Sequence, residues 1–385
     1  MEYFLTEEQE MIRDLARKIA KEKVEPVAAE LDETGEFPWE ILNVLAESDL
    51  CGVYIPEEYG GFGGGVLEQC LVVEELSKAC SGVAVSYAAS GLGSFPILLF
   101  GTEEQKQKYI PSVASGKSLA AFGLTEANAG SDAGAMETTA VKDGDHYILN
   151  GTKQWITNGG EADIYTVIAV TDKTKGSRGN SAFIVEKGTP GFTFGKKENK
   201  MGIRASTTRE LIFQDCRIPK ENLLGREGMG FIVAMKTLDV TRPGIAAQAL
   251  GIASGALEAA LNYARERRQF GQPIASFQAI QHMLADMAIQ IEAARALLYS
   301  TARMIDSGAK NYSKESSMCK VLASDVAMKV TVDAVQIFGG YGYMKEYPVE
   351  KMMRDAKITQ IYEGTNQIQR NIIALEMIKE AARKR

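Results

Sequence analysis

Three stretches of different periodicity follow one another along this chain of 385 residues. From Thr6 to about Gly116, apolar residues recur at helical spacing. Between about Ala120 and Asp215, short β-like segments alternate with Asn, Gly and Asp turns, and helical spacing returns from Phe231. Helices and strands do not alternate and no GxGxxG occurs, so a parallel βαβ nucleotide-binding domain is disfavoured.

This order predicts an α+β protein of three domains. We expect an N-terminal helical domain over residues 1–119, a middle β-barrel or β-sandwich domain over 120–230 and a C-terminal four-helix bundle over 231–385. A capping box of Thr6 and Gln9 predicts where the first helix begins. A redox cofactor would bind at the junction between the β domain and the bundle.

Composition excludes several classes of function. The formal net charge is −7, with both signs interleaved, so no electropositive surface for nucleic acid is expected. The five cysteines are far apart, and the two histidines, His146 and His282, lie more than a hundred positions from each other, which predicts no metal site and no Ser/His/Asp triad. A general base is therefore expected to be a carboxylate. The start of the chain lacks a signal-peptide pattern and no run is expected to span a bilayer, which predicts a cytoplasmic protein without membrane contact.

Four motifs carry a family resemblance. They are FGLTEANAGSD at 122–132, KQWITNGG at 153–160, RERRQFG at 265–271, and QIFGGYGY with QIYEGTNQIQR in the last fifty residues. In order and spacing, over nearly the full length, they resemble the acyl-CoA dehydrogenase flavoproteins. The resemblance implies FAD as cofactor, α,β-dehydrogenation of an acyl-CoA thioester to the trans-2-enoyl-CoA, and electron-transferring flavoprotein as the electron acceptor.

The first motif places hydroxyl groups in a loop of small residues that leaves a strand. By itself such a loop is more often a capped turn. The resemblance implies that it touches both flavin and substrate, and the matching positions are Phe122, Leu124, Thr125, Gly130 and Ser131. In the second motif a strand tryptophan is usually a core residue. The resemblance instead makes Trp155 a flavin-packing residue beside Ile156, with Thr157 donating a hydrogen bond to the isoalloxazine edge.

A second group of predicted cofactor residues lies in the C-terminal half. Arg267, Phe270 and Gln278 fall at and after the end of a long helix, where a basic cluster is ordinarily solvated. The resemblance implies that Arg267 pairs with the FAD pyrophosphate bound by a neighbouring subunit, so we expect a homotetramer built as a dimer of dimers. Further positions that match FAD contacts are Gln336, Gly339, Gly340, Thr365 and Gln367.

Glu363, in the last motif, is the predicted catalytic base. An acidic residue there could instead be a helix N-terminal acid. Burial would raise its pKa toward that of an activated thioester. Gly364 would let the backbone turn and bring a peptide N–H to the thioester oxygen, and Tyr362 would border the acyl chain. Some branches of the family carry the base at the position of Thr241, and the threonine here favours the short- and medium-chain arrangement.

The remaining substrate contacts are expected on two helices. Asp239 and Arg242 match residues near the base and the CoA arm, although Arg242 precedes Pro243 and could pair structurally at a helix kink. Small residues on the helix within GVAVSYAASGLGSFPI would leave room for a short- to medium-chain, branched or cyclic acyl group. These residues are Ala84, Ala88 and Leu92.

Two other functions stay open from the sequence. A flavin-dependent acyl-CoA oxidase would use the same fold, although the oxidase relatives are mostly longer and the nitroalkane-oxidising relatives carry Asp where Glu363 stands. A non-catalytic module that binds flavin or acyl-CoA is the second alternative, and an intact Glu363 argues against it.

Overall fold

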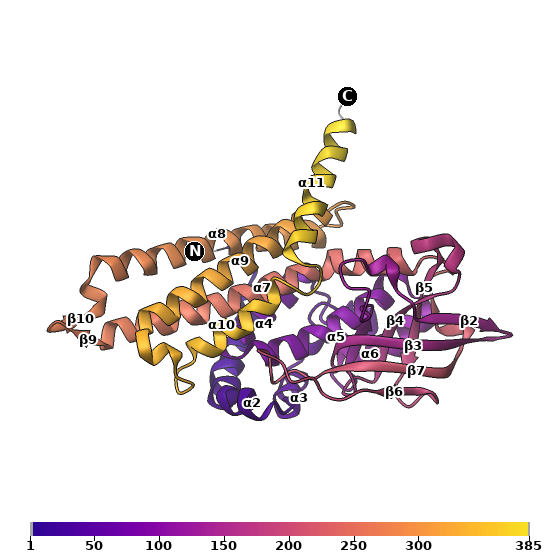
Figure 1. Cartoon of the computed structure of the whole chain (residues 1–385), viewed down its shortest axis with the longest axis horizontal. Coiled ribbons are helices and arrows are strands. Elements are labelled where there is room, and N and C mark those ends of the chain that lie inside the picture. Colours follow the sequence, from indigo (N-terminus) through magenta and orange to yellow (C-terminus); the bar gives the residue numbers. More distant parts are fainter. Residues whose placement is uncertain (1–2, 384–385) are drawn as a thin grey trace.

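The structure is a computed structural model that describes residues 3–383 (Figure 1). Its N-terminal part is helical. Thr6 begins the first helix as expected, because its hydroxyl accepts from the Gln9 N–H while the Gln9 side chain accepts from the Thr6 N–H. The α-helices of this part are α1 (Glu7–Ile19), α2 (Ala28–Thr34), α3 (Trp39–Glu47), α4 (Val66–Ala79), α5 (Ser81–Phe100) and α6 (Glu103–Ala114).

The helices α4 and α5 form the interior of the N-terminal part. Almost every residue of α4 is buried, so the amphipathic pattern expected there is wrong: the helix is covered on all sides by its neighbours α1, α5 and α7. The expectation that no run could span a bilayer also needs correction. Both α5 and α7 are long and apolar enough by length and composition, but 72% of each apolar window is buried inside the protein. Core helices have this property.

The middle part is a mixed sheet. Its hydrogen-bonded order is β6-β7-β3-β2-β4-β5-β8, and β1 pairs with β4 in parallel. Not all of its strands are the short segments expected: residues 146–157 form the single long strand β3, which pairs along its length with β7. The strands are β1 (Ala120–Gly123), β2 (Thr139–Asp143), β3 (His146–Thr157), β4 (Ile164–Val170), β5 (Asn180–Glu186), β6 (Phe192–Phe194), β7 (Thr208–Pro219) and β8 (Leu223–Leu224).

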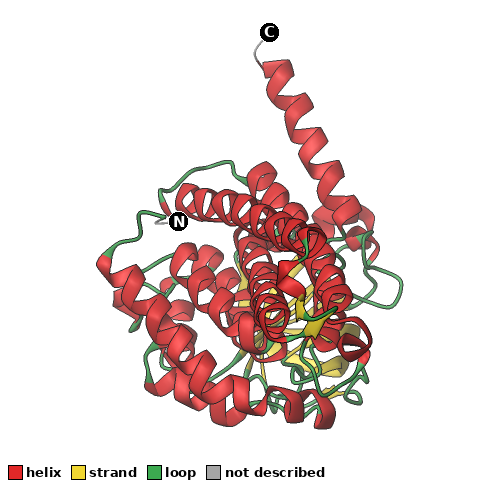
Figure 2. Cartoon of the chain, turned by 90° about the vertical axis from the view of Figure 1, so that its left-hand side faces the viewer, coloured by secondary structure: helices red, strands yellow, loops and turns green. Residues whose placement is uncertain are grey.

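The C-terminal part is a bundle of long helices, which confirms the expected α+β fold class. The first bundle helix, α7, runs from the sheet to a hairpin of β9 (Arg268–Gln269) and β10 (Gln272–Pro273) at the opposite end of the molecule (Figure 1). The last helix, α11, leaves the bundle and projects away from it (Figure 2). The helices are α7 (Gly230–Glu266), α8 (Gln278–Asp306), α9 (Ser313–Phe338), α10 (Val349–Thr359) and α11 (Asn366–Arg383).

The length of α7 sets the distance between the two predicted groups of site residues. Thr241 lies in its first third, whereas Arg267 caps its C-terminus. At the helical rise per residue, the 26 steps between them correspond to about 39 Å. Within one chain, the two groups of predicted site residues are therefore far apart.

Candidate active site

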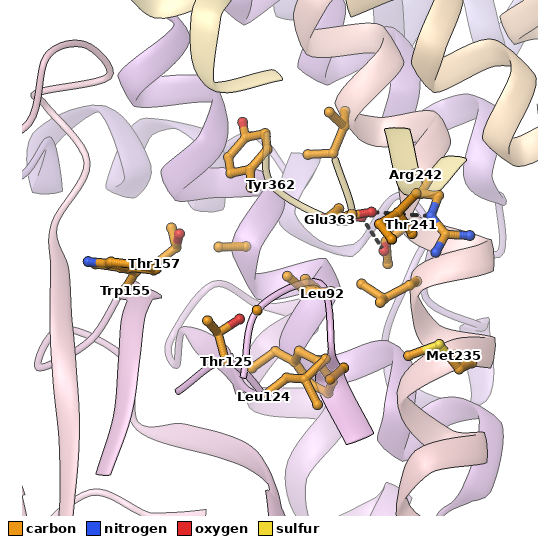
Figure 3. A pocket seen from close by; sticks show the side chains of 18 of the residues that line it. Leu92, Leu124, Thr125, Trp155, Thr157, Met235, Thr241, Arg242, Tyr362 and Glu363 are labelled. Atoms are coloured by element: carbon orange, nitrogen blue, oxygen red, sulfur yellow. Dashed lines mark hydrogen bonds between the residues drawn. The ribbon is translucent and has the colours of Figure 1, made fainter. Parts of the chain in front are cut away.

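A cavity of about 380 Å³ lies where α5, the loop after β1, the end of β3, α7 and the turn between α10 and α11 meet (Figure 3). It brings together side chains from five separated segments of the sequence. The predicted site residues that line it are Ala88, Leu92, Phe122, Leu124, Thr125, Gly130, Ser131, Trp155, Ile156, Thr157, Arg242, Tyr362, Glu363 and Gly364.

Glu363 lies in the turn before α11, with a left-handed backbone at φ 51°, and Gly364 follows at φ 90°. A non-glycine residue adopts this conformation at a cost, so surrounding contacts must hold it. The Gln369 amide donates to the carbonyls of Glu363 and Gly364 at 3.0 and 3.1 Å, and the Arg242 Nε donates to the Glu363 carbonyl at 3.3 Å. The alternative of a helix N-terminal acid is thereby excluded, because α11 starts only at Asn366.

The carboxylate of Glu363 faces the cavity. The Thr241 hydroxyl donates to Oε2 at 2.8 Å (Figure 3). Burial raises the pKa of Glu363 to about 7, opposed by the Thr241 hydrogen bond and by the charges of Arg242 and Lys320. A carboxylate with this pKa is a stronger base than an ordinary glutamate and still has an ionised fraction at neutral pH.

Arg242 combines the two roles considered from the sequence. It lines the cavity, yet it is only 2% exposed and donates to Asp239 Oδ1 at 2.7 Å. Asp239 does not line the cavity, since it lies behind Arg242 and also accepts from the Ser313 hydroxyl at 2.8 Å. Asp239 therefore orients the guanidinium group, and only Arg242 can reach a bound molecule.

Tyr362 presents its ring to the cavity (Figure 3). Its hydroxyl donates to the Gln248 amide oxygen on α7, and burial raises the pKa of Tyr362 far above its ordinary value. The sequence reasoning missed Gln248. It also missed Met235, Leu238 and Ile245, which line the cavity from the same helix. The spacing of these α7 residues with Thr241 was the available signal.

A β-bulge near the end of β3 determines how the second motif faces the cavity. The register with β7 slips between Lys153 and Ile156, and Trp155 has φ 58°. The side chains of β3 therefore do not alternate regularly between its two faces at this point. The bulge leaves the Trp155 ring 57% exposed, whereas Ile156 is 3% exposed. Thr157 lies beside Trp155, across the cavity from Glu363 (Figure 3).

A buried ion pair that the sequence reasoning missed fixes the loop after β1. The Lys153 Nζ lies 2.7 Å from Glu126 Oε1 and donates to the Leu124 carbonyl at 3.1 Å. Glu126 in turn accepts from the N–H groups of Glu137 and Thr138 at 2.6 and 3.0 Å. Strand β3 and the loop that contains Thr125 are thus tied together beneath the cavity.

Helix α5 lines the cavity with a different set of residues from the one expected. Ala88 and Leu92 line the cavity, whereas Ala84 is fully buried elsewhere in the core. Val85 and Ala89 take part instead. A helix presents positions i, i+3, i+4 and i+7 on one face, which here are Val85, Ala88, Ala89 and Leu92. A constant spacing of four residues, as in the expected set, departs from this face at Ala84.

Only some residues of the second predicted group lie together, at the far end of α7. Arg267, Gly339 and Gly340 line an open groove of about 550 Å³, where the Arg267 guanidinium lies 5.2 Å from the centre of the Tyr341 ring. The other residues predicted to contact FAD lie outside both cavities. Phe270 is 92% exposed at the hairpin tip, Gln278, Gln336 and Gln367 are exposed, and the Thr365 hydroxyl accepts from the Ile368 N–H at the start of α11.

The residues of the first cavity fit a flavin ring. The side-chain hydroxyls of Thr125, Ser131 and Thr157 form no hydrogen bond with any residue in 3–383, so they are free to bind a polar ring edge. The exposed face of Trp155 offers a flat packing surface. The groove at Arg267 combines a cation with bare glycine backbone, which fits a pyrophosphate.

Comparison with known proteins gives the family. The N-terminal, middle and C-terminal domains of acyl-CoA dehydrogenase match residues 6–117, 121–216 and 228–378. A short-chain-specific acyl-CoA dehydrogenase of Clostridium acetobutylicum is 52% identical over 97% of this chain and 99% of its own length. Butyryl-CoA dehydrogenase from Megasphaera elsdenii has the same fold with a TM-score of 0.96, at 51% identity over 98% of this chain and all of that one.

A third similar chain comes from a structure described as the electron transferring flavoprotein of Acidaminococcus fermentans. It is 56% identical, covers 98% of this chain and 99% of its own, and has a TM-score of 0.96. The domain matches, the full-length similarity and the flavin-compatible cavity agree with one another, and a solved relative contains FAD. This chain therefore belongs to the acyl-CoA dehydrogenase family, and it is an FAD-binding oxidoreductase.

Proposed function

We propose that this protein converts a short- to medium-chain acyl-CoA thioester to its trans-2-enoyl-CoA, with Glu363 taking the α-proton. FAD, when bound, supplies the acceptor for the β-hydride. The observation that carries the proposal is the carboxylate of Glu363, whose pKa is raised to about 7 and which faces the Trp155 and Thr157 wall across the cavity. An acyl chain between them would have its α-carbon at the base.

Each residue around the base has a physical task in this reaction. Thr241 fixes one carboxylate oxygen, so the other is available to the substrate proton. The left-handed turn at Glu363 and Gly364 aims the carboxylate into the cavity. Apolar side chains of α5 and α7, among them Leu92 and Met235, exclude water and keep the base strong.

The substrate class rests on the size of the cavity and on its relatives. Leu92, Met235 and Leu238 line the apolar part of the cavity between α5 and α7, and its volume of about 380 Å³ suits a short chain better than a very long one. The Clostridium relative is named short-chain specific, and the Megasphaera structure is a butyryl-CoA dehydrogenase. Turnover measured across thioesters of increasing length should peak among the short and medium chains, and a peak at very long chains alone would exclude this assignment.

We further propose a homotetramer that passes electrons to electron-transferring flavoprotein. Arg267 lies about 39 Å along α7 from Thr241, so one chain does not bring the pyrophosphate groove to its own cavity. A second copy could supply it. The similar chain in the Acidaminococcus structure described as an electron transferring flavoprotein supports this choice of electron acceptor.

The decisive experiment is anaerobic reduction of the purified flavoprotein by a panel from butyryl- to octanoyl-CoA. The flavin absorbance should bleach in the wild-type protein and persist in Glu363→Gln with the same FAD content. Bleaching that survives in the variant would show that another group is the base. A yellow protein that binds every thioester without bleaching would be a non-catalytic module, and rapid peroxide formation in air would indicate an oxidase.

A further inference from the structure

Lys320 is a buried cation that the proposed reaction does not yet use. It lies on α9 and its side chain has no exposed surface. The ammonium group donates to the Gly364 carbonyl at 2.9 Å and to the Asn366 Oδ1 at 2.8 Å. Both acceptors are neutral. Removing an ammonium group from water is costly, and two neutral acceptors compensate it only in part.

The charged groups around this ammonium come from three elements. They are Arg242 on α7, Asp325 on α9 itself and Glu363 in the turn before α11. Two of them are already in ion pairs at 2.7 Å, Arg242 with Asp239 and Asp325 with Arg370. Within residues 3–383 the carboxylate of Glu363 forms no ion pair within 4 Å, and its hydrogen-bond partner is the Thr241 hydroxyl. The lysine charge therefore acts mainly on the proposed base.

We propose that Lys320 is a positioning residue for the dehydrogenation: its buried ammonium group ties the Glu363–Gly364 turn to α9 and places a positive charge behind the base. This inference rests on the function proposed above for Glu363. The tie acts on a strained turn, because Glu363 and Gly364 both have left-handed backbone and the Gly364 carbonyl points at Lys320. The charge favours the ionised carboxylate, which is the form that accepts a proton.

The two groups influence each other in opposite directions. Burial lowers the pKa of Lys320 to about 7, and the negative charge of Glu363 limits this fall. Burial raises the pKa of Glu363 to about 7, and the positive charge of Lys320 limits that rise. The charge of each group therefore favours the ionised form of the other. Loss of the lysine charge should raise the pKa of Glu363 by about one unit, as a pair interaction near 1.4 kcal/mol would give.

The test compares Lys320→Met, which removes the charge and the hydrogen bonds, with Lys320→Gln, which keeps a donor, and Lys320→Arg, which keeps the charge. The pH dependence of kcat and kcat/KM is measured on FAD-loaded protein of each variant. The acidic limb should move upward by about one pH unit in the Met and Gln variants and return toward the wild-type position in the Arg variant. Infrared titration of the carboxyl band that disappears in Glu363→Gln should show the same shift without turnover.

Lys351→Met is the matched control, because Lys351 is also buried but pairs with Asp355 on α10 and lies outside the cavity. In Lys351→Met the acidic limb of the pH profile should stay at its wild-type position even if the melting temperature of the variant falls. An unmoved limb in folded, FAD-loaded Lys320→Gln, or an equal shift in Lys351→Met, would overturn the inference. Glu363→Gln separates the two proposals: if it keeps full turnover, the base assignment fails, whereas an inactive Glu363→Gln beside an unshifted Lys320→Gln removes only the role of Lys320.

Discussion

The Thr241 hydroxyl donates a 2.8 Å hydrogen bond to the Glu363 carboxylate, although 122 positions of sequence separate the two residues. By resemblance, Thr241 occupies the position where other branches of the family carry the base. In the structure, α7 and the turn before α11 meet at one side of the same cavity. In this chain the α7 position carries a hydroxyl that binds the carboxylate of Glu363, the proposed base.

Thr241→Val should lower the activity at low pH, because less of Glu363 is ionised there. Valine keeps the shape of threonine but cannot donate to Oε2, and that hydrogen bond lowers the pKa of Glu363. Loss of about 1 kcal/mol of stabilisation of the ionised form corresponds to a rise of about 0.7 pH unit. The acidic limb of the kcat profile should move upward by this amount, and Thr241→Ser should leave it near its wild-type position.

Gly364→Ala should lower kcat about tenfold or more while FAD content stays normal, because a misplaced base slows proton transfer steeply. The backbone there has φ 90°, and a Cβ would lie 2.3 Å from the Gln369 Nε2 that holds the turn. Gly308→Ala is the control, since Gly308 has φ 79° and no atom of residues 3–383 lies within 4 Å of an added Cβ. Equal losses of activity in both variants would show that backbone strain alone is responsible.

Glu363→Gln should be more stable than the wild type above neutral pH and about equally stable near pH 4, below the unfolded pKa. The folded pKa of about 7 lies above the ordinary value of 4.5, so the folded state binds more protons between these pH values. The contribution of Glu363 to the free energy of unfolding therefore falls as pH rises through this window. Denaturant unfolding should show a gain of about 2 kcal/mol in the variant at pH 8, after allowance for partial exposure. A constant difference at all pH values would contradict the raised pKa.

Lys153→Met should destabilise the protein by about 3 kcal/mol, because it leaves Glu126 buried without its cation. The loop after β1 loses its tie to β3, so FAD should also dissociate more readily. Thermal unfolding and FAD release measure the two effects. The double variant Lys153→Met with Glu126→Gln removes the unpaired charge and should recover part of the stability; no recovery would argue against the ion pair as the cause.

Arg267→Ala and Glu363→Gln should complement each other if two copies build one site. Each variant alone should have little activity, the first through lost FAD and the second through the lost base. Co-expressed with different affinity tags, mixed oligomers contain some sites with both wild-type residues. Turnover should recover in the doubly tagged fraction. No recovery in confirmed mixed oligomers would place both functions within one chain.

The sequence alone determined the order of the three parts and the family, because periodicity and turn residues are local properties and the motifs are contiguous. It also identified Glu363, Tyr362 and Gly364 as one unit, since they are neighbours in the chain. Local patterns did not predict features that depend on tertiary packing. Helix α4 is buried on every side, and the bulge at Trp155 interrupts the alternation of side chains along β3.

Only the tertiary structure showed which distant residues surround Glu363. Thr241, Arg242 and Lys320 reach Glu363 from two helices, and Gln248 reaches Tyr362, at separations that no local pattern encodes. The raised pKa of Glu363 likewise depends on burial, which α5, α7 and α9 create together. Sequence fixes which chemical groups are present, whereas their electric environment follows from which surfaces pack against them.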